Sequence, residues 1–350
     1  MKKILSILLS LLFVLSLLPL STFANLNSSD ISTQTTITAN PCLKWKDGEK
    51  PKLGDTFTYG SYPQTKVTDT TLISALNQIE AEWISYNYYN EGSISDYMEY
   101  KDVEYEREKY RAVTFSKYRP YYTTDSSPTS NDNGYYTNTV YWFKYEPLEW
   151  KVLNPETGLC MCTSIIDSQQ FYNNDYYGTK TRDGESCYAN SYKHSDIRTF
   201  LNNTFYNTAF TDTEKSNIAS TTISSNDYTK DYSTGNGDVT DKVFLLSYSD
   251  ITNTTYGFDS NFSTYDTARQ FKGTDYAKCQ GLYVSTSSSY FGNSYWWLRS
   301  AGRTDAYACD VNSNGYVDDH TRQRHWQRRP PRFMHTQSVI CNHLPFLRQR

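Results

Sequence analysis

The chain has 350 residues, including 33 Tyr, with a mean hydropathy of −0.70 and a formal net charge of −4. Removing the two Lys of the first three residues and the seven Arg of residues 320–350, which hold no Asp or Glu, changes that charge to −13 for residues 25–319. Residues 25–319 are therefore strongly acidic, which argues against a nucleic-acid partner. The length fits one large domain or two small ones.

The first residues have the pattern of an export signal. A positive start precedes an apolar run over residues 4–18, and small residues precede a cleavage position after Ala24. We expect residues 1–24 to be a removed signal peptide and the mature protein to be secreted and extracellular. A retained anchor is the alternative, but Pro19 shortens the apolar run. No second long run follows, so no integral membrane segment is expected after cleavage.

The next part of the chain predicts a tether and the first ordered elements. Residues 25–52 are rich in Ser, Thr and Asn and predict a disordered linker. Residues 56–59 alternate polar and aromatic side chains, which predicts a strand. Residues 70–79 place aliphatic side chains at helical spacing. The Tyr-rich stretch over residues 82–142 predicts long loops with one hairpin.

Local patterns are clearer in the middle of the chain. Residues 148–153 and 159–166 predict two strands joined by the turn at residues 154–158. Ser195 or Asp196 caps an expected helix, and Thr211 to Glu214 form a capping box.

The remaining elements are predicted strands. Residues 242–246 and 295–299 are short apolar runs, and residues 306–312 and 316–317 flank an Asn314-Gly315 turn. Strands on both sides of central helices predict the α+β class.

Six blocks of sequence carry a resemblance. They include the Gly-Ser-Tyr-Pro-Gln, Ile-Arg-x-x-Leu-Asn and Trp-Trp-Leu-Arg-Ser motifs, and they occupy residues 54–64, 146–153, 195–202, 205–210, 242–247 and 296–300. In this order they resemble a family of exported proteins of Gram-positive bacteria known only as a domain of unknown function. The resemblance covers residues 53–319 and implies a single α+β domain there.

A second resemblance concerns the fold alone. The Trp-rich strand, the hairpin after it and the closing strand are similar to the C-type-lectin-like fold of sugar-binding lectins and formylglycine-generating enzymes. This implies an irregular antiparallel sheet with short helices and long loops. A shared fold does not assign chemistry.

The end of the chain departs from the family pattern. Family members end on Gly-Val-Arg-Pro-Ala-Leu, whereas residues 320–350 are basic, hold four of the five His and contain no Tyr. Codons for Arg328 to Met334 read one base later permit the family ending. A frameshifted, aberrant tail is therefore one hypothesis, and a genuine basic tail that binds anionic wall polymers is the other.

Candidate metal ligands are weak. Cys160 and Cys162 face the same side of a strand, where a mutual bond would be strained, so each pairs elsewhere or stays a buried thiol. Residues 310–317 resemble the start of a calcium loop, but Thr321 stands where that loop needs an acidic ligand. We therefore expect a hairpin, with no metal and no cofactor.

Trp296, Trp297 and Arg299 are the candidate ligand-binding residues. Two interpretations stay open: both Trp pack in the core, or an exposed Trp and Arg299 form an aromatic platform for a sugar.

Signatures of catalysis are missing from the sequence. It has no Gly-x-Ser-x-Gly, phosphate loop or His-Glu-x-x-His, and His194 is the only His before residue 320. We expect a secreted, non-catalytic binding or adhesion module for a glycan or a cell-surface protein. The alternatives are a secreted enzyme, either a carboxylate-based glycan hydrolase or a Cys oxidase, and a structural exoprotein.

Overall fold

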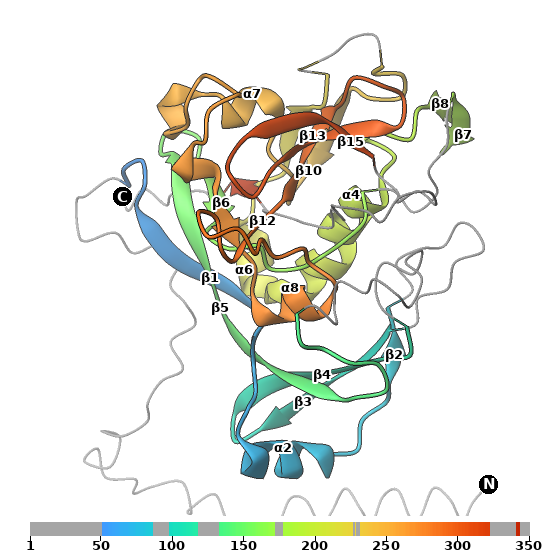
Figure 1. Ribbon diagram of the computed structural model, residues 1–350, viewed down its shortest axis with the longest axis vertical. Helices are drawn as coiled ribbons and strands as arrows, with labels where there is room; N and C mark the ends of the chain where they lie inside the picture. The colour runs from blue at the N-terminus through green and yellow to red at the C-terminus, as the bar shows by residue number, and fades with distance from the viewer. Residues whose placement is uncertain are drawn as a thin grey trace, which may run out of the picture. The chain divides into compact units, whose positions relative to one another are not determined.

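The computed structural model describes most of the chain after residue 50 (Figure 1). The described residues are 51–86, 98–117, 133–171, 178–226, 228, 232–322 and 341–343. The chain divides into residues 1–41 and 42–350, and all described residues belong to the second part. The predicted signal peptide and residues 25–50 of the predicted linker lie outside them and stay predictions. Within the described residues, no helix is both long and apolar enough to cross a membrane.

One antiparallel sheet of seven strands combines the six strands of residues 56–162 with one strand from near the end of the chain. Its strands are β1 (Thr56–Lys66), β2 (Ile84–Ser85), β3 (Met98–Tyr105), β4 (Glu108–Phe115), β5 (Tyr141–Asn154), β6 (Leu159–Cys162) and β16 (Cys341–His343). β1 pairs along β5 from Thr56 opposite Lys151 to Lys66 opposite Phe143. β4 pairs with the beginning of β5 and β6 with its end, so β5 connects two parts of the sheet.

The predicted hairpin at residues 154–158 is confirmed as the connection between β5 and β6. The Asn154 side chain accepts from the backbone N–H groups of Glu156 and Thr157. Gly158 has a φ of 79°, which only Gly adopts without strain. The residues of this five-residue turn therefore favour the observed pairing of β5 with β6.

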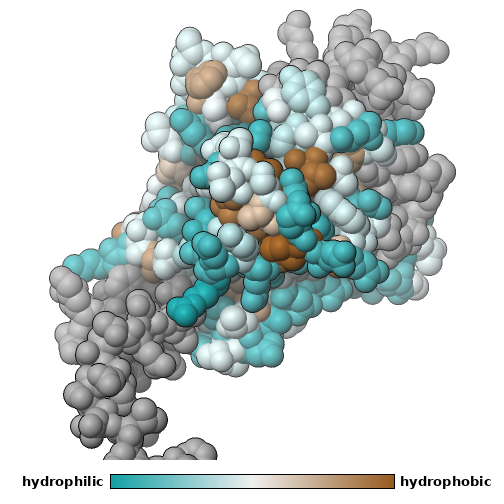
Figure 2. Space-filling view, turned by 90° about the horizontal axis from the view of Figure 1, so that it is seen from below, coloured by the Kyte–Doolittle hydropathy of each residue, from teal (hydrophilic) through white to brown (hydrophobic). Residues whose placement is uncertain are grey.

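The helix α2 (Thr70–Asn77) covers one face of β3, β4 and β5. Asp69 caps it, and Leu76 packs against Tyr110 and Trp142 from the sheet. Figure 2 looks onto this end of the molecule and shows apolar side chains near the centre of the face, bordered by hydrophilic ones. The opposite face of the sheet packs into the main core, because successive strand residues point to opposite sides.

The central helices form where their caps predicted them. They are α4 (Asp196–Phe200), the π-helical turn η1 (Leu201–Phe205), α5 (Tyr206–Ala209) and α6 (Asp212–Asn217). The Ser195 hydroxyl accepts from the Arg198 backbone N–H, and Thr211 and Glu214 complete the expected capping box. These capping side chains satisfy first-turn N–H groups of α4 and α6, which have no partner inside the helix. η1 and α5 follow α4 directly and have no side-chain cap.

Short strand pairs and helices make up the rest. The strands are β7 (Lys180–Arg182), β8 (Glu185–Cys187), β9 (Thr221–Ser224), β10 (Asp238–Asp241), β11 (Phe271–Lys272), β12 (Asn293–Ser294), β13 (Trp296–Ala301), β14 (Tyr307–Val311) and β15 (Val317–Arg322). The helices are α7 (Tyr248–Ile251), η2 (Thr254–Tyr256), η3 (Thr267–Arg269) and α8 (Asp275–Cys279). β13, β14 and β15 form a three-stranded sheet. The class is α+β with mostly antiparallel pairing, as predicted.

The predicted strand at residues 242–246 is wrong. Val243 to Leu246 are fully or almost fully buried, but they form no strand of their own: Phe244 makes only an isolated bridge, and the Leu246 carbonyl accepts from the Arg299 N–H of β13 at 2.9 Å. Their backbone groups bond instead to single partners, such as the Asn202 side chain, which accepts from the Val243 N–H. A short apolar run therefore predicts that its residues are buried, but it does not predict that they pair with a neighbouring strand.

Two pieces of the predicted tail lie in strands. β15 continues through Arg322, and β16 adds to the edge of β6 with Cys341 opposite Met161. The other tail residues lie outside the described ones, so the frameshift and the genuine tail both stay hypotheses.

The seven-stranded sheet and the second half of the chain share one hydrophobic core. Buried polar contacts also cross between them. The Tyr62 hydroxyl donates to Asp167 at 2.6 Å, and Tyr86 and Tyr276 share a hydroxyl–hydroxyl bond of 2.6 Å. Breaking this junction would leave buried polar groups without partners, which is costly.

Candidate functional site

Trp296 and Trp297 lie in the core and form no exposed platform. Each is 0% exposed. The Trp296 indole N–H donates to the Arg269 carbonyl at 2.9 Å, and that of Trp297 donates to the Gln169 carbonyl at 3.3 Å. All six residues of β13 are buried, so both faces of the strand are covered. The platform interpretation of these two rings is thus corrected to core packing.

Arg299 connects β13 to its neighbours. It is 7% exposed, and its Nε donates to the Ser224 carbonyl at 2.7 Å. Its Nη1 donates to the Leu245 carbonyl and to the Asp250 carboxylate, each at 2.7 Å. These contacts tie β13 to the end of β9 and to α7, so Arg299 has a structural role in the described structure.

Four other aromatic side chains form a row on the surface, which we call the aromatic strip: Tyr228, Tyr248, Phe262 and Tyr316. Successive ring centroids are 4.5, 6.0 and 6.3 Å apart. Tyr228 is 37% and Phe262 40% exposed, while Tyr248 and Tyr316 are half-buried. Aromatic rings attract one another at these distances, so the strip exists before any ligand arrives.

Backbone hydrogen bonds hold the strip together. Tyr248 begins α7, and its N–H donates to the Ser300 hydroxyl at 2.8 Å, at the end of β13. The Phe262 carbonyl accepts from the Val317 N–H at 3.0 Å, which joins its loop to the hairpin that carries Tyr316. Three of the four rings are therefore anchored to the sheet of β13, β14 and β15.

The loop around Phe262 is braced from inside by a buried arginine. Arg269 is 0% exposed, and its Nη2 donates to the carbonyls of Asp259 and Asn261 at 3.0 and 2.9 Å. Its Nε pairs with Asp266 at 3.0 Å, and Asp266 also accepts from the Asp259 N–H. Burial alone would raise the pKa of Asp266, but these hydrogen bonds hold it below its usual value. Phe262 is thus presented by an ordered loop.

One end of the strip is acidic. The Tyr228 hydroxyl donates to Asp319 at 2.6 Å. Partial burial and the Asp319 carboxylate raise the pKa of Tyr228, so the phenol stays protonated as a donor. Burial and Asp319 also raise the pKa of Asp318. The exposed Arg303 lies nearby, and its backbone N–H donates to the Asp319 carbonyl at 3.1 Å.

The calcium-like residues form the predicted hairpin between β14 and β15. Asp310 is 0% exposed within β14. Gly315 has a φ of 85°, and a Cβ there would lie 2.2 Å from the Asp266 carbonyl oxygen. This Gly is therefore needed for a close backbone approach. The described residues include no group of three or more His, Cys, Asp and Glu suited to a metal ion.

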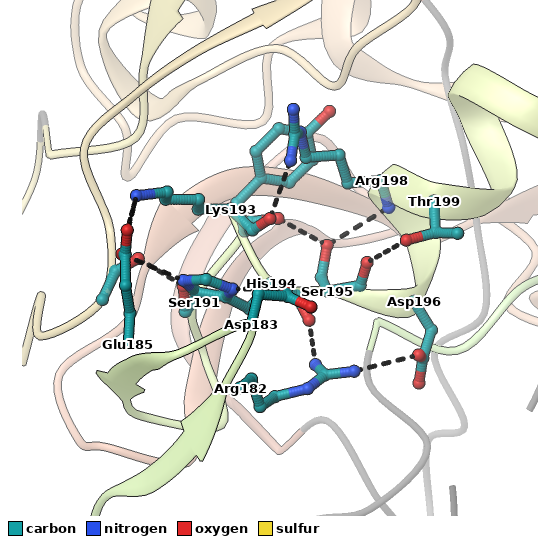
Figure 3. Close-up of polar contacts among 12 residues, drawn as sticks. Arg182, Asp183, Glu185, Ser191, Lys193, His194, Ser195, Asp196, Arg198 and Thr199 are labelled. Carbon is teal, nitrogen blue, oxygen red and sulfur yellow. Dashed lines mark hydrogen bonds and ion pairs between the residues drawn. The ribbon is translucent and has the colours of Figure 1, made fainter. Parts of the chain in front are cut away.

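His194 lies between two carboxylates of the β7–β8 hairpin (Figure 3). Its Nδ1 is 2.9 Å from Asp183 Oδ2, and its Nε2 is 3.3 Å from Glu185 Oε2. Both contacts are hydrogen bonds only when each ring nitrogen carries a proton. The His194 side chain is 3% exposed, so the ring fastens the hairpin and is not presented to a substrate.

Further charged pairs surround this histidine (Figure 3). Lys193 Nζ lies 2.6 Å from Glu185, and Arg182 donates to the His194 carbonyl and pairs with Asp196 at 3.4 Å. The hydrogen bond from His194 lowers the pKa of Asp183, and that from Lys193 lowers the pKa of Glu185. The hairpin is thereby held against the start of α4.

The described cysteines away from β16 are all buried. Cys160 is an unbridged thiol whose Sγ donates to the Gly158 carbonyl at 3.4 Å. Burial raises its pKa well above the usual value, so it stays protonated. A buried, protonated thiol is a poor nucleophile, which fits a packing role.

The fold and the strip define an α+β domain with a preformed aromatic surface. Residues 163–332 match the model of a family described as Domain of unknown function (DUF6273). This match includes the Trp-Trp-Leu-Arg-Ser strand and all four residues of the aromatic strip, and it begins directly after β6. No curated protein and no solved structure matches the chain.

Sequence reasoning missed the strip because its members are far apart along the chain. The abundance of Tyr predicted an aromatic surface but not which of 33 Tyr would be exposed. A usable signal was Phe262, the only aliphatic or Phe side chain in the otherwise polar loop of residues 259–266, whose other aromatic residue is Tyr265.

Proposed function

We propose that the protein is a secreted, non-catalytic binding module that recognises a glycan through the aromatic strip. The observation that carries this proposal is the row of four rings, two of them more than one-third exposed. Flat aromatic faces cover the apolar faces of sugar rings, and neighbouring polar groups bond to hydroxyls. The Tyr228 hydroxyl and the Asp319 carboxylate are such groups at one end of the strip.

Rigidity supports a recognition role. Arg269 and Asp266 order the Phe262 loop before a ligand binds. Binding to a preordered surface loses less conformational entropy, so a modest contact area gives measurable affinity. Among the residues whose side chains are described, the single His is His194, and its burial between two carboxylates disfavours a catalytic role for this ring.

The proposal includes two finer expectations. The sheet of β13, β14 and β15 is taken as C-type-lectin-like, in keeping with the Trp-rich strand followed by a hairpin. The protein is taken as an exported product of a Gram-positive bacterium, with surface glycans as its natural ligands. The acidic body disfavours polyanionic partners.

A glycan array tests the proposal with the full chain and two single variants. Phe262→Ala removes an exposed ring from the strip, and Phe291→Ala removes a ring that is 68% exposed outside it. We expect selective glycan binding that falls about tenfold in Phe262→Ala, or ~1.4 kcal/mol, and stays unchanged in Phe291→Ala. Cleavage of bound glycans would favour the enzyme alternative. Silence on the array, or equal losses in both variants, would refute the proposal.

A further inference from the structure

We infer that the aromatic strip binds single, uncharged chains of several β-linked sugars, and not the flat faces of crystalline polysaccharides or isolated disaccharides. This inference rests on the proposed function and names the substrate class of the same surface. It follows from the distances and angles between the four rings of the strip.

The rings of the aromatic strip do not share a plane. From Tyr228 through Tyr248 and Phe262 to Tyr316, successive rings are turned by 40°, 49° and 72° against one another. A crystalline polysaccharide presents its sugar rings in one plane, so only coplanar aromatic rings can contact such a face at the same time. A single chain rotates about its glycosidic bonds and turns each sugar toward a different ring. The tilts therefore favour a single chain.

Packing between the Phe262 loop and the β14–β15 hairpin holds one of these tilts in place. The Phe262 carbonyl accepts from the Val317 N–H at 3.0 Å. A Cβ on Gly315 would lie 2.2 Å from the Asp266 carbonyl oxygen, so the turn beside Tyr316 is in direct contact with the base of the loop. The Phe262 and Tyr316 rings cannot become coplanar through a movement of the loop unless these contacts break.

The spacing of the rings fits consecutive sugars of one chain. Successive centroids are 4.5, 6.0 and 6.3 Å apart, which is close to the separation of neighbouring sugars in a β-1,4-linked chain. Tyr228 and Phe262 are more than one-third exposed, and the other two rings are half-buried. Once one sugar is bound, the next is held near its own ring at a high effective concentration. Affinity should therefore increase with chain length.

The chemistry of the strip favours uncharged, β-linked chains. In β-linked glucose and N-acetylglucosamine the ring substituents are equatorial, which leaves both faces of each sugar as flat C–H surfaces. Aromatic faces cover such surfaces without any charged partner. The formal charge of −13 over residues 25–319 disfavours polyanionic chains.

The experiment compares soluble oligomers with crystalline powders on the full chain. Isothermal titration measures the binding of dimers and hexamers from two uncharged series, the cello-oligosaccharides and the N-acetylated chito-oligosaccharides. Sedimentation with microcrystalline cellulose or chitin measures how much protein each powder removes from solution. We expect the hexamer of at least one series to bind at least about tenfold more tightly than its dimer. Neither powder should remove the protein.

Single variants test whether the length preference belongs to the strip. Tyr316→Ala removes a ring at one end of the strip, and Phe291→Ala removes a ring that is 68% exposed outside it. The ratio of hexamer to dimer affinity should fall in Tyr316→Ala and stay unchanged in Phe291→Ala. Phe262→Ala, in an exposed position, replaces Tyr316→Ala if that variant does not unfold cooperatively in urea. An unchanged ratio in a folded strip variant would overturn the inference.

The outcomes distinguish this inference from the proposed function. Removal of the protein by either powder, or a dimer that binds as tightly as the hexamer, would overturn the inference. Failure of both oligomer series, with other array glycans bound in a manner sensitive to Phe262→Ala, would also overturn it and leave glycan binding intact. Failure of every oligomer and of every glycan on the array would refute the proposed function itself.

Discussion

Replacing the buried Arg111 tests how the seven-stranded sheet is joined to the second half of the chain. Arg111 lies on β4 and is 1% exposed. Its guanidinium bonds to both oxygens of Asp102 at 2.7 and 2.8 Å and to the Tyr276 hydroxyl at 3.2 Å. It also stacks on the Tyr100 ring, with the guanidinium carbon 4.1 Å from the ring centroid. One side chain therefore connects two strands to α8.

The Arg111→Met variant keeps most of the side-chain volume but removes the charge. Asp102 then loses its main partner inside a largely enclosed site, and removal of one member of a buried ion pair costs roughly 3 to 5 kcal/mol. The Asp102 side chain is 25% exposed, so we expect the lower end of that range. Equilibrium unfolding in urea of the full chain measures the change in free energy.

Lys109→Met is the matched control because it faces the same carboxylate. Lys109 Nζ lies 3.6 Å from Asp102, and its side chain is 40% exposed. An exposed pair contributes at most about 1 kcal/mol. If Arg111→Met costs no more than Lys109→Met, the buried junction does not hold the two halves together as described.

The pH dependence of the same pair has a definite sign. Burial alone would raise the pKa of Asp102, but the hydrogen bond and charge of Arg111, the charge of Lys109 and the Tyr145 hydroxyl together lower it. A lowered pKa in the folded state stabilises the protein above the unfolded pKa, about 3.9, and this stabilisation is lost as the pH falls through the folded value. In Arg111→Met, the free energy of unfolding should therefore fall less steeply as the pH is lowered through the acidic range.

The other predictions concern the core, a turn and the β7–β8 hairpin. Trp297→Ala should lower the free energy of unfolding by roughly 3 to 5 kcal/mol, the usual cost of a large buried aromatic residue, as urea titration would show. Gly315→Ala should be clearly more destabilising than Gly184→Ala. Both glycines have a positive φ, but only a Cβ at residue 315 would meet a backbone carbonyl. Equal melting temperatures of the two variants would contradict this prediction. The pKa values of Asp183 and Glu185 are lowered in the folded protein. Acidification that protonates these two carboxylates should therefore loosen the β7–β8 hairpin and speed its amide exchange. Amide exchange that does not depend on pH, after correction for the intrinsic rate, would contradict this prediction.

Local chemistry made several elements predictable. The Ser195 cap, the Thr211 to Glu214 capping box and the turn at residues 154–158 each involve residues within five positions of one another. Their partners are therefore visible in the sequence. The α+β class follows from the same local patterns.

Burial and surface assembly were not predictable in the same way. Whether Trp297 is covered depends on Gln169, which lies 128 positions away. The aromatic strip depends on chain segments that meet only in the folded protein, and Phe262 is positioned by Arg269 and the β14–β15 hairpin. The run at residues 242–246 shows the same limit, since its apolar residues specify burial but not strand pairing.

The most direct test of glycan recognition by the aromatic strip is hydroxyl-radical footprinting of the full chain with and without its tightest array ligand. We predict that bound glycan protects Phe262 and Tyr316 from oxidation. Phe291 and Tyr136, which are 68% and 57% exposed outside the strip, should be oxidised as before. Unchanged oxidation of Phe262 at saturating glycan would contradict the account.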